Sequence, residues 1–345
     1  MRALRLTAPR TFQWDDDREP LPGPGEVVIA VRAVGVCASD IHMYSHGRIG
    51  DTALQSPLIL GHELSGVIAA TGLGVTHVKV GQLVAVDPAV PCGTCEPCSE
   101  GNPNLCRDLR FFGTWPYDGA LRERLSHPAN LIHPLGESLT AVDGAMLEPL
   151  GVAIHGVDLG HLRPGCSVSI HGCGPIGLLV LQVARAAGAA RLLAVEPIPG
   201  RRAMALKMGA DHAIDVDGSQ VEQILRSTGG RGVDVAFEAA GENQAVEDAV
   251  EVAKPGGRVV LIGIPPDDRT HFRASAARRK GLTILLCRRM RHTYPRAMGL
   301  AESGRIDLRT LVTHRVPLEE APHAFDLVER RADGVVKAVI ESSAS

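Results

Sequence analysis

Four cysteines lie close together in one short stretch of the chain. They are Cys92, Cys95, Cys98 and Cys106, with two, two and seven residues between them. Four thiolates in a segment rich in Pro and Gly match a closed tetrahedral zinc site, which stabilises a loop and leaves no position for substrate. An iron–sulfur cluster is the competing interpretation, but the partner motifs of an electron-transfer protein are absent. The spacing therefore predicts a structural zinc ion.

A second set of possible metal ligands is spread over the first half of the chain. The candidates are one Cys, one His and two Glu, namely Cys37, His62, Glu63 and Glu148. Sulfur, nitrogen and oxygen from three protein ligands leave one zinc position open for water or substrate. Zinc held in this way polarises a hydroxyl group and lowers its pKa. A single buried Cys or His is as often a core residue, so spacing alone leaves both interpretations open.

A glycine-rich motif begins the second half of the chain. It consists of Gly172, Cys173, Gly174, Pro175, Ile176 and Gly177. The motif follows a predicted strand at 168–170 and opens a predicted helix, which is the context that a dinucleotide fingerprint requires. The first glycine permits a tight turn, the second lets the backbone approach a pyrophosphate, and the third packs helix on strand. The helix N-terminus then faces the phosphates.

The carboxylate of Glu196 indicates which dinucleotide binds. It ends the next predicted strand, 19 residues after Gly177. A carboxylate there can bind the ribose 2′-hydroxyl and repel a 2′-phosphate, which favours NAD over NADP. Arg201 and Arg202 follow shortly, and an arginine can accommodate that phosphate. We expect NAD.

The elements that must position these residues are of two kinds. Up to about Leu150 the sequence has short apolar runs broken by Gly and Pro, which predicts an irregular, mostly β lobe. After Pro164, strands alternate with helices, which predicts βαβ units and a parallel sheet. The strands are expected at 27–36, 168–170, 191–195, 233–237, 258–262, 282–286 and 335–340, and the helices at 175–187, 200–208, 242–253, 295–303 and 317–330.

These patterns divide the chain into three segments. Residues 1–150 form a first domain, which contains the cysteine lobe at 88–110. Residues 151–289 form the nucleotide-binding domain, and residues 290–345 return to the first domain.

The composition excludes several classes of protein. The 345 residues include 36 Lys and Arg against 39 Asp and Glu, a formal charge of −3, with no basic run that would attract nucleic acid or an anionic membrane. No apolar stretch reaches the roughly 18 residues of a membrane helix. The N-terminal segment lacks the apolar core of a secretory signal. We therefore expect a cytoplasmic protein with reduced thiols and no nucleic-acid or membrane partner.

Taken together and in this order, the three motifs resemble those of the zinc-dependent medium-chain alcohol dehydrogenases. The resemblance runs from Leu21 to Ile340. Within the family the chain is similar to the sorbitol (polyol) dehydrogenase branch, on the segments 37–42, 46–50, 111–114, 118–121, 148–150 and 311–319. The resemblance implies a GroES-like, mostly β catalytic domain and an α/β Rossmann domain with a doubly wound parallel sheet. It also implies a catalytic zinc in the cleft between them.

The resemblance also implies roles for the candidate ligands and their neighbours. Cys37 and His62 would hold the catalytic zinc with Glu63, while Glu148 would lie beside the zinc-bound water or ligate the metal in some states. Ser39 would take the proton from the bound hydroxyl, and His42 would pass it through the cofactor ribose to solvent.

The remaining implied contacts concern cofactor and substrate. Arg201 would lie over the adenine ribose, and the polyol would contact Phe111, Thr114 and Arg289. Two residues depart from the branch, because Met43 and Met290 stand where sorbitol dehydrogenases commonly have Tyr. A site without those hydroxyls discriminates less strongly for a sugar alcohol.

The implied activity is oxidation of a secondary alcohol of a polyol resembling sorbitol, xylitol or iditol to a ketose. The enzyme would use NAD, one catalytic and one structural zinc per chain, and a homotetrameric assembly. Alternatives are an aminocyclitol, inositol or L-threonine dehydrogenase of the same family, or a catalytically silent structural relative that keeps NAD. The 111–114 and 311–314 segments argue against threonine, and intact Cys37 and His62 argue against the silent relative.

Overall fold

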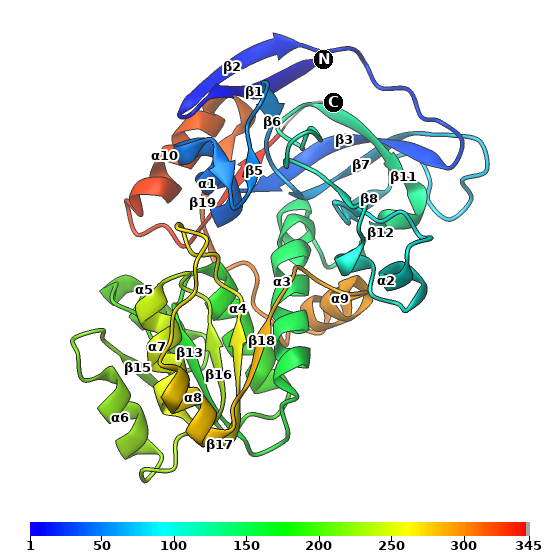
Figure 1. Ribbon diagram of the computed structural model, residues 1–345. Coiled ribbons are helices and arrows are strands. Elements are labelled where there is room, and N and C mark those ends of the chain that lie inside the picture. The colour runs from blue at the N-terminus through cyan, green and yellow to red at the C-terminus, as the bar shows by residue number, and fades with distance from the viewer. Residues whose placement is uncertain (343–345) are drawn as a thin grey trace. The chain divides into compact units, whose positions relative to one another are not determined.

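The computed structural model describes residues 1–342, which divide into two compact units (Figure 1). Unit 1 comprises Met1–Glu148, Tyr294–Glu302 and, among the described residues, 308–342; unit 2 comprises Pro149–Thr293 and Ser303–Asp307. These units are defined by their compactness and not by function. The domain limits at 150 and 289, which the sequence predicts, therefore remain predictions.

The largest sheet of unit 1 has seven strands, in the order β12-β8-β7-β3-β20-β19, with β11 also paired to β3. The strands are β3 (Glu26–Gly35), β7 (Glu63–Thr71), β8 (Leu83–Val86), β11 (Arg124–Pro128), β12 (Ile132–Pro134), β19 (Val312–Pro317) and β20 (Lys337–Glu341). Strand β3 is central and almost wholly buried, as its run of β-branched residues predicts. Strand β20 pairs antiparallel with it, so residues from opposite ends of the chain share one sheet.

Short strands and helices surround this sheet. The other strands of unit 1 are β1 (Arg2–Ala8), β2 (Thr11–Asp16), β4 (Arg48–Ile49), β5 (Thr52–Ala53), β6 (Leu58–Ile59), β9 (Ala89–Val90) and β10 (Arg110–Phe111). Its helices are α1 (Ala38–His46), α2 (Glu96–Ser99), α9 (Tyr294–Glu302) and α10 (Ala321–Arg330), with 3-10 turns at Pro103–Leu105, Ala129–Leu131 and Leu318–Glu320. Helices α9 and α10 confirm the two helical stretches predicted near the end of the chain.

Helix α10 fixes helix α1 through an aromatic cluster. The Phe325 ring packs edge-to-face on Phe12, with centroids 5.0 Å apart, and lies 5.3 Å from the ring of Tyr44 on α1. The Tyr44 hydroxyl donates a 2.8 Å hydrogen bond to Asp326 on α10. Because aromatics make up only 3% of the chain, this cluster is an uncommon concentration of large side chains.

Unit 2 is a six-stranded parallel sheet in the order β15-β14-β13-β16-β17-β18. The strands are β13 (Ser167–His171), β14 (Arg191–Val195), β15 (His212–Ile214), β16 (Val233–Glu238), β17 (Ala253–Leu261) and β18 (Thr283–Leu286). The helices are α4 (Pro175–Ala186), α5 (Pro199–Lys207), α6 (Gln220–Ser227), α7 (Asn243–Val252) and α8 (Ala274–Lys280). The strand order reverses at β13, and right-handed crossovers place α4 and α5 on the opposite face from α6, α7 and α8. The predicted doubly wound sheet is confirmed.

Helix α3 (Ala141–Gly160) corrects the expectation that the chain up to Leu150 is strand-rich with little helix. Its 20 residues include Pro149, and the helix continues through it. Apolar residues cover the helix almost all round, so the 3.6-residue period that marks a surface helix is absent from the sequence. No helix in residues 1–342 combines the length and apolar composition needed to cross a membrane.

Replacing Phe325 by Ala tests how strongly α10 holds unit 1 together. The ring is 1% exposed, so we expect the change to lower the free energy of unfolding by about 3–5 kcal/mol. Urea denaturation followed by circular dichroism measures the loss. Leu73→Ala is the control, since Leu73 is 83% exposed and should change stability by less than about 0.5 kcal/mol. Equal losses in the two variants would contradict the packing role of Phe325.

Candidate metal centres and cofactor loop

Three of the predicted zinc ligands meet in unit 1. Cys37 is the N-cap residue of α1, His62 immediately precedes β7, and Glu63 begins that strand. The thiol sulfur, an imidazole nitrogen and a carboxylate oxygen of these residues all lie within 4.8 Å of one another. The histidine and the glutamate are buried, and the cysteine is half-buried. This donor set fits a zinc ion that keeps one position for an outside ligand.

Asp40, on the first turn of α1, orients two of these ligands. Its carboxylate accepts the Cys37 backbone N–H at 3.1 Å and the Gly61 backbone N–H at 3.3 Å. One of its oxygens also lies 3.3 Å from Nδ1 of His62. Burial lowers the pKa of His62, but Asp40 and Cys37 outweigh it and hold that pKa well above its ordinary value. A carboxylate on Nδ1 leaves Nε2 of His62 for a metal, the arrangement that outer-shell carboxylates typically give.

A buried lysine neutralises Glu63. Nζ of Lys337, on β20, forms an ion pair with the Glu63 carboxylate and donates a 2.9 Å hydrogen bond to the carbonyl of Val36. Both side chains are at most 2% exposed. Gly35 makes room for the pair, because a Cβ at that position would lie 2.0 Å from the Glu63 carboxylate and 3.1 Å from Cε of Lys337.

Glu148 on α3 is the other predicted carboxylate, and it is buried in the same unit. Its pKa is raised to about 7, chiefly by burial and also by the Glu63 carboxylate, against the lowering effect of His62 and Lys337. It lies outside the group whose ligand atoms are within 4.8 Å of one another. The structure therefore places one glutamate in the cluster and the second as its electrostatic neighbour.

The predicted proton-relay residues lie on α1, next to Cys37. Ser39 and His42 are three residues apart, which puts them on one face of the helix. Burial and the neighbouring His46 lower the pKa of His42, so its imidazole is neutral at pH 7. A neutral imidazole can accept a proton from a neighbour and release it again.

The predicted substrate contacts are divided between the two units. The Phe111 ring lies 5.1 Å from the His62 ring, which puts it against the ligand cluster, and Thr114 is half-buried in the turn that follows. Arg289 belongs to unit 2 and has a positive φ of 49°, uncommon for a residue with a side chain. Met43 is 1% exposed and packs in the hydrophobic core of unit 1, while Met290 is buried against Gly151 of α3.

The four clustered cysteines form the second candidate metal centre. Their sulfurs all lie within 4.8 Å of one another, and that of Cys95 is 3.5 Å from Cys98 and 3.8 Å from Cys106. Four thiolates around a zinc ion at 2.3 Å have sulfurs about 3.8 Å apart, so the spacing suits a tetrahedral site. Backbone N–H groups of Thr94 and Cys95 lower the pKa of Cys92 to about 6, which favours the thiolate that binds a metal.

The glycine-rich loop of unit 2 joins β13 to α4. Gly172 has a φ of 94°, and a Cβ there would lie 2.7 Å from the backbone nitrogen of Ala240. At Gly177 a Cβ would lie 1.8 Å from the Gly172 carbonyl, so the helix packs against the loop only because this residue has no side chain. Gly174 caps α4, Pro175 and Ile176 begin it, and only Arg201 lies within 4 Å of a Cβ built on Gly174. The loop therefore leaves space at the helix N-terminus, where a pyrophosphate would bind.

The Glu196 carboxylate lies beside this loop. It accepts backbone N–H groups from Cys173 at 2.7 Å and Ile198 at 3.0 Å. Arg202 is engaged elsewhere, since its guanidinium donates to the carbonyls of Glu196 and Pro197 and forms a 2.8 Å ion pair with Asp215. The guanidinium of Arg202 is therefore held away from the Glu196 carboxylate.

Sequence reasoning missed Lys337 and Gly35. The signal for the first is a lone lysine within the otherwise apolar run 335–340, since a buried cation needs an anionic partner. Gly35 carries no comparable signal, because the sequence does not show which side chains cross the strand at that position.

Comparison with known proteins extends over nearly the whole chain. The alcohol dehydrogenase GroES-like domain matches residues 23–137, and the zinc-binding dehydrogenase domain matches residues 175–303. A sorbitol dehydrogenase of Bacillus subtilis (strain 168) is 38% identical over 89% of this chain and 89% of its own. D-xylulose reductase A of Aspergillus niger is 37% identical over 94% of this chain and 92% of its own.

Solved structures agree in fold over 99% of the chain. An oxidoreductase/dehydrogenase of unknown specificity from Escherichia coli superposes with a TM-score of 0.95 at 31% identity, over 99% of its own chain. A protein from Sinorhizobium meliloti 1021 described as a zinc-binding dehydrogenase bound to NADP gives 0.90 at 31%, over 98% of its chain. A protein from Escherichia coli CFT073 described as a short chain alcohol dehydrogenase complexed with NADH gives 0.91 at 29%, over 99%.

Removing Cys95 should empty one metal site and leave the other filled. We expect Cys95→Ala to lower the zinc content from two ions per chain to one and to lower the melting temperature by several degrees, because a structural zinc contributes directly to folding. Native mass spectrometry and calorimetry measure both changes. Cys166→Ala, a half-buried cysteine outside both clusters, is the control. Unchanged stoichiometry in Cys95→Ala would exclude a zinc ion held by the four cysteines.

Removing Lys337 should leave the buried charge of Glu63 without a partner. In the metal-free protein we expect Lys337→Met to cost about 3–5 kcal/mol of unfolding free energy, because it leaves a buried carboxylate without a partner. A metal bound to Glu63 would supply the missing positive charge, so the loss should be smaller in the zinc-loaded protein. Chemical denaturation with and without zinc measures the two losses, and Lys207→Met on the exposed surface is the control. Losses that do not depend on zinc would argue against Glu63 as a ligand.

Proposed function

Because the chain belongs to the zinc-dependent medium-chain alcohol dehydrogenases, in their sorbitol dehydrogenase-like branch, we propose that it oxidises a secondary alcohol of a polyol to a ketose with NAD. The observation that carries the proposal is the buried Cys, His and Glu cluster, set in a chain that matches a sorbitol dehydrogenase over 89% of both lengths. When bound, zinc polarises the substrate hydroxyl and NAD accepts the hydride.

In this proposal Cys37, His62 and Glu63 hold the catalytic metal, and Asp40 keeps the imidazole in the orientation that ligation needs. Glu148 is the neighbouring acid, and burial raises its pKa to about 7. A group that titrates near neutral pH can exchange a proton with a water or hydroxyl beside it.

The proton of the substrate hydroxyl passes to Ser39 and then to His42. The support is their shared face on α1, directly after Cys37, together with a His42 that is neutral at pH 7. A neutral imidazole receives the proton without having to lose one first. The relay is therefore carried by the same helix that supplies the cysteine ligand.

Polyol recognition in the proposal rests on Phe111, Thr114 and Arg289. Phe111 supplies an apolar wall against His62, and the other two supply hydrogen-bonding groups for hydroxyls. Met43 is fully packed in the core and offers no group to a substrate. We accordingly propose a looser preference among polyols than a site with tyrosines at these positions would have.

Three further features belong to the proposal. The four cysteines hold one structural zinc per chain, so that each chain carries two zinc ions. The active assembly is a homotetramer, in line with the family resemblance, and it works in the cytoplasm on a small-molecule substrate.

NAD is the proposed cofactor, with its adenine ribose between Glu196 and Arg201 and its pyrophosphate on the N-terminus of α4. One structural neighbour was solved with NADH and another with NADP, so the fold accepts either dinucleotide. For this chain the choice follows from a carboxylate beside the loop and from Arg202, which is held by Asp215 and two carbonyls.

A substrate panel tests the activity. We expect NAD reduction with sorbitol, xylitol or iditol to exceed, in kcat/KM, the rate with L-threonine, inositol, aminocyclitols and simple secondary alcohols by at least tenfold. Cys37→Ser should abolish turnover because the catalytic ligand set is incomplete, whereas Cys166→Ala should keep it. A preference for threonine or a cyclitol would move the chain to another branch, and full activity of Cys37→Ser would remove that residue from the site.

The cofactor preference depends on the charge of Glu196. We expect kcat/KM with NAD to exceed that with NADP by at least a hundredfold, and Glu196→Gln to reduce that ratio at least tenfold by removing repulsion of the 2′-phosphate. Glu222→Gln, an exposed glutamate on α6, is the control and should leave the ratio unchanged. Steady-state kinetics with both dinucleotides give the ratio, and an unaltered value in Glu196→Gln would refute the role.

A further inference from the structure

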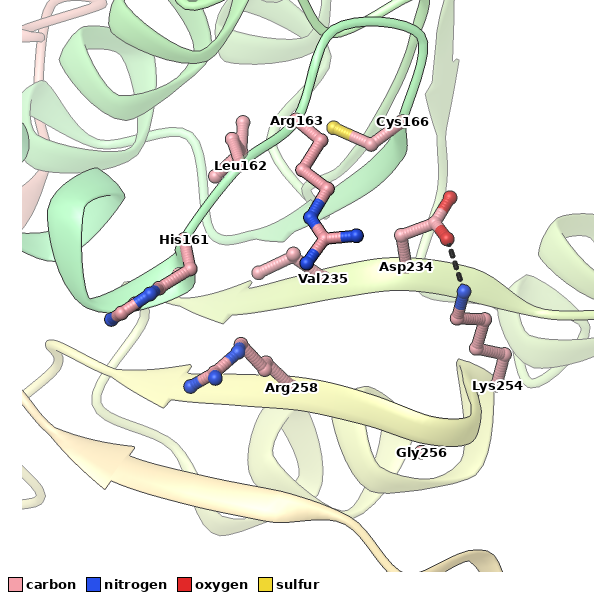
Figure 2. A pocket seen from close by; sticks show the side chains of 10 residues that line it. His161, Leu162, Arg163, Cys166, Asp234, Val235, Lys254, Gly256 and Arg258 are labelled. Carbon is pink, nitrogen blue, oxygen red and sulfur yellow. Dashed lines mark ion pairs between the residues drawn. The ribbon is translucent and has the colours of Figure 1, made fainter.

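Unit 2 contains a cavity of about 610 Å³ at the edge of its sheet (Figure 2). The loop between α3 and β13 forms one wall, and the beginnings of β16 and β17 form the others. Ten residues line it: Gly160, His161, Leu162, Arg163, Cys166, Asp234, Val235, Lys254, Gly256 and Arg258. The volume is in the range of small-molecule sites, which run from roughly 300 to 1,000 Å³.

The charges of the lining are unbalanced. Asp234 is the only acidic residue among the ten, whereas three of them have positively charged side chains: Arg163, Lys254 and Arg258. Its carboxylate is already fully engaged, with a 2.5 Å ion pair to Lys254, a 2.6 Å ion pair to Arg231, and hydrogen bonds from the Ser167 N–H and hydroxyl. These contacts hold the pKa of Asp234 far below its usual range. The acid therefore has no capacity left to neutralise the two arginines.

The guanidinium groups of Arg163 and Arg258 have no hydrogen-bond or ion-pair partner within residues 1–342. Figure 2 shows the Arg163 side chain extending from the loop across Val235, and the Arg258 side chain rising from the neighbouring strand toward His161. Each guanidinium offers five N–H donors in a planar fork that fits the oxygens of a phosphoryl or carboxylate group. Two unpaired guanidinium groups in one concave site suit an anion with at least two charges.

We propose that this cavity binds a compact polyanionic metabolite, through phosphoryl or carboxylate oxygens held by Arg163 and Arg258. Lys254 stays paired with Asp234 and adds to the positive side of the wall. The site takes no part in the proposed dehydrogenase chemistry, and the inference stands whether or not the chain oxidises a polyol.

The cavity and the cofactor loop lie at opposite ends of the sheet. The cavity is lined where β13 and β16 begin, whereas Gly172 and Glu196 follow the carboxyl ends of β13 and β14. Ligands of open α/β sheets bind at the carboxyl ends, so the cavity is not the dinucleotide site. Strand β13 has five residues, which separates the two sites by roughly 15 Å at about 3.3 Å per residue. A polyanion can therefore bind while the dinucleotide is in place.

Isothermal titration calorimetry of the full, zinc-loaded chain tests the proposal. Inorganic pyrophosphate and citrate are titrated separately at fixed ionic strength, with the dinucleotide site saturated by NADH. We expect one binding site per chain. The probe that binds with the higher affinity, pyrophosphate or citrate, shows whether the natural ligand offers phosphoryl or carboxylate groups. The Arg163→Ala/Arg258→Ala double variant should lose at least tenfold in affinity. Arg269→Ala is the matched control, since that exposed arginine lies in the segment after the carboxyl end of β17.

If the double variant binds NADH as tightly as the wild type, unit 2 is still folded in that variant. If it does not, the single variants Arg163→Gln and Arg258→Gln are used in place of the double variant. Three results would overturn the proposal. They are the absence of saturable binding of both probes to the wild type, equal affinity in the wild type and the arginine variants, and binding that disappears when NADH is present. The last would place the probe on the glycine-rich loop instead.

Discussion

The buried ion pair between Lys337 and Glu63 determines how unit 1 is built. Two charges removed from water are tolerated only as close partners, so β20 must lie where its first residue reaches the start of β7. The central strand β3 passes between them, and at Gly35 it has no side chain to block the contact. The Val36 carbonyl accepts a hydrogen bond from the same ammonium group. The candidate catalytic ligands thus occur where these three strands meet.

The two candidate metal centres are built in opposite ways. Four cysteines within fifteen residues form the first, so local turns alone bring its ligands together. The second draws on the start of α1, on the start of β7, on α3 and on the last strand of the sheet. Its geometry exists only when the whole unit is folded. A local site can stabilise a loop without affecting the rest, whereas a dispersed site ties its own chemistry to the integrity of the sheet.

Sequence patterns predicted unit 2 better than unit 1. Strands buried on both faces and separated by amphipathic helices are distinct in the sequence, so β13, α4 and β14 were placed within a residue or two. Several elements were not predicted, and for three of them the reason can be identified. Helix α3 is apolar almost all round and contains Pro149, β15 has only three residues, and α6 follows the mostly polar stretch 215–219. Among the site residues, the four cysteines were predictable from residue type and spacing, whereas Cys37 and His62 were assigned only through the resemblance to the family. Lys337 was not, because its partner is over 270 residues away and only the sheet brings them together.

The strand order of unit 1 sets the sequence of events as the chain is made. The ligands at positions 37, 62 and 63 are synthesised early, and the whole continuous stretch 149–293 of unit 2 follows before position 337 is added. Until then Glu63 has no ammonium partner, and residues 33–35 of β3 lack the strand that pairs with them on the side opposite β7. Domains fold as units during synthesis, so the nucleotide-binding unit has all its strands before the metal-binding unit does. The candidate metal cluster of Cys37, His62 and Glu63 is therefore among the last parts of the protein to reach its final surroundings, although its three residues are among the first made.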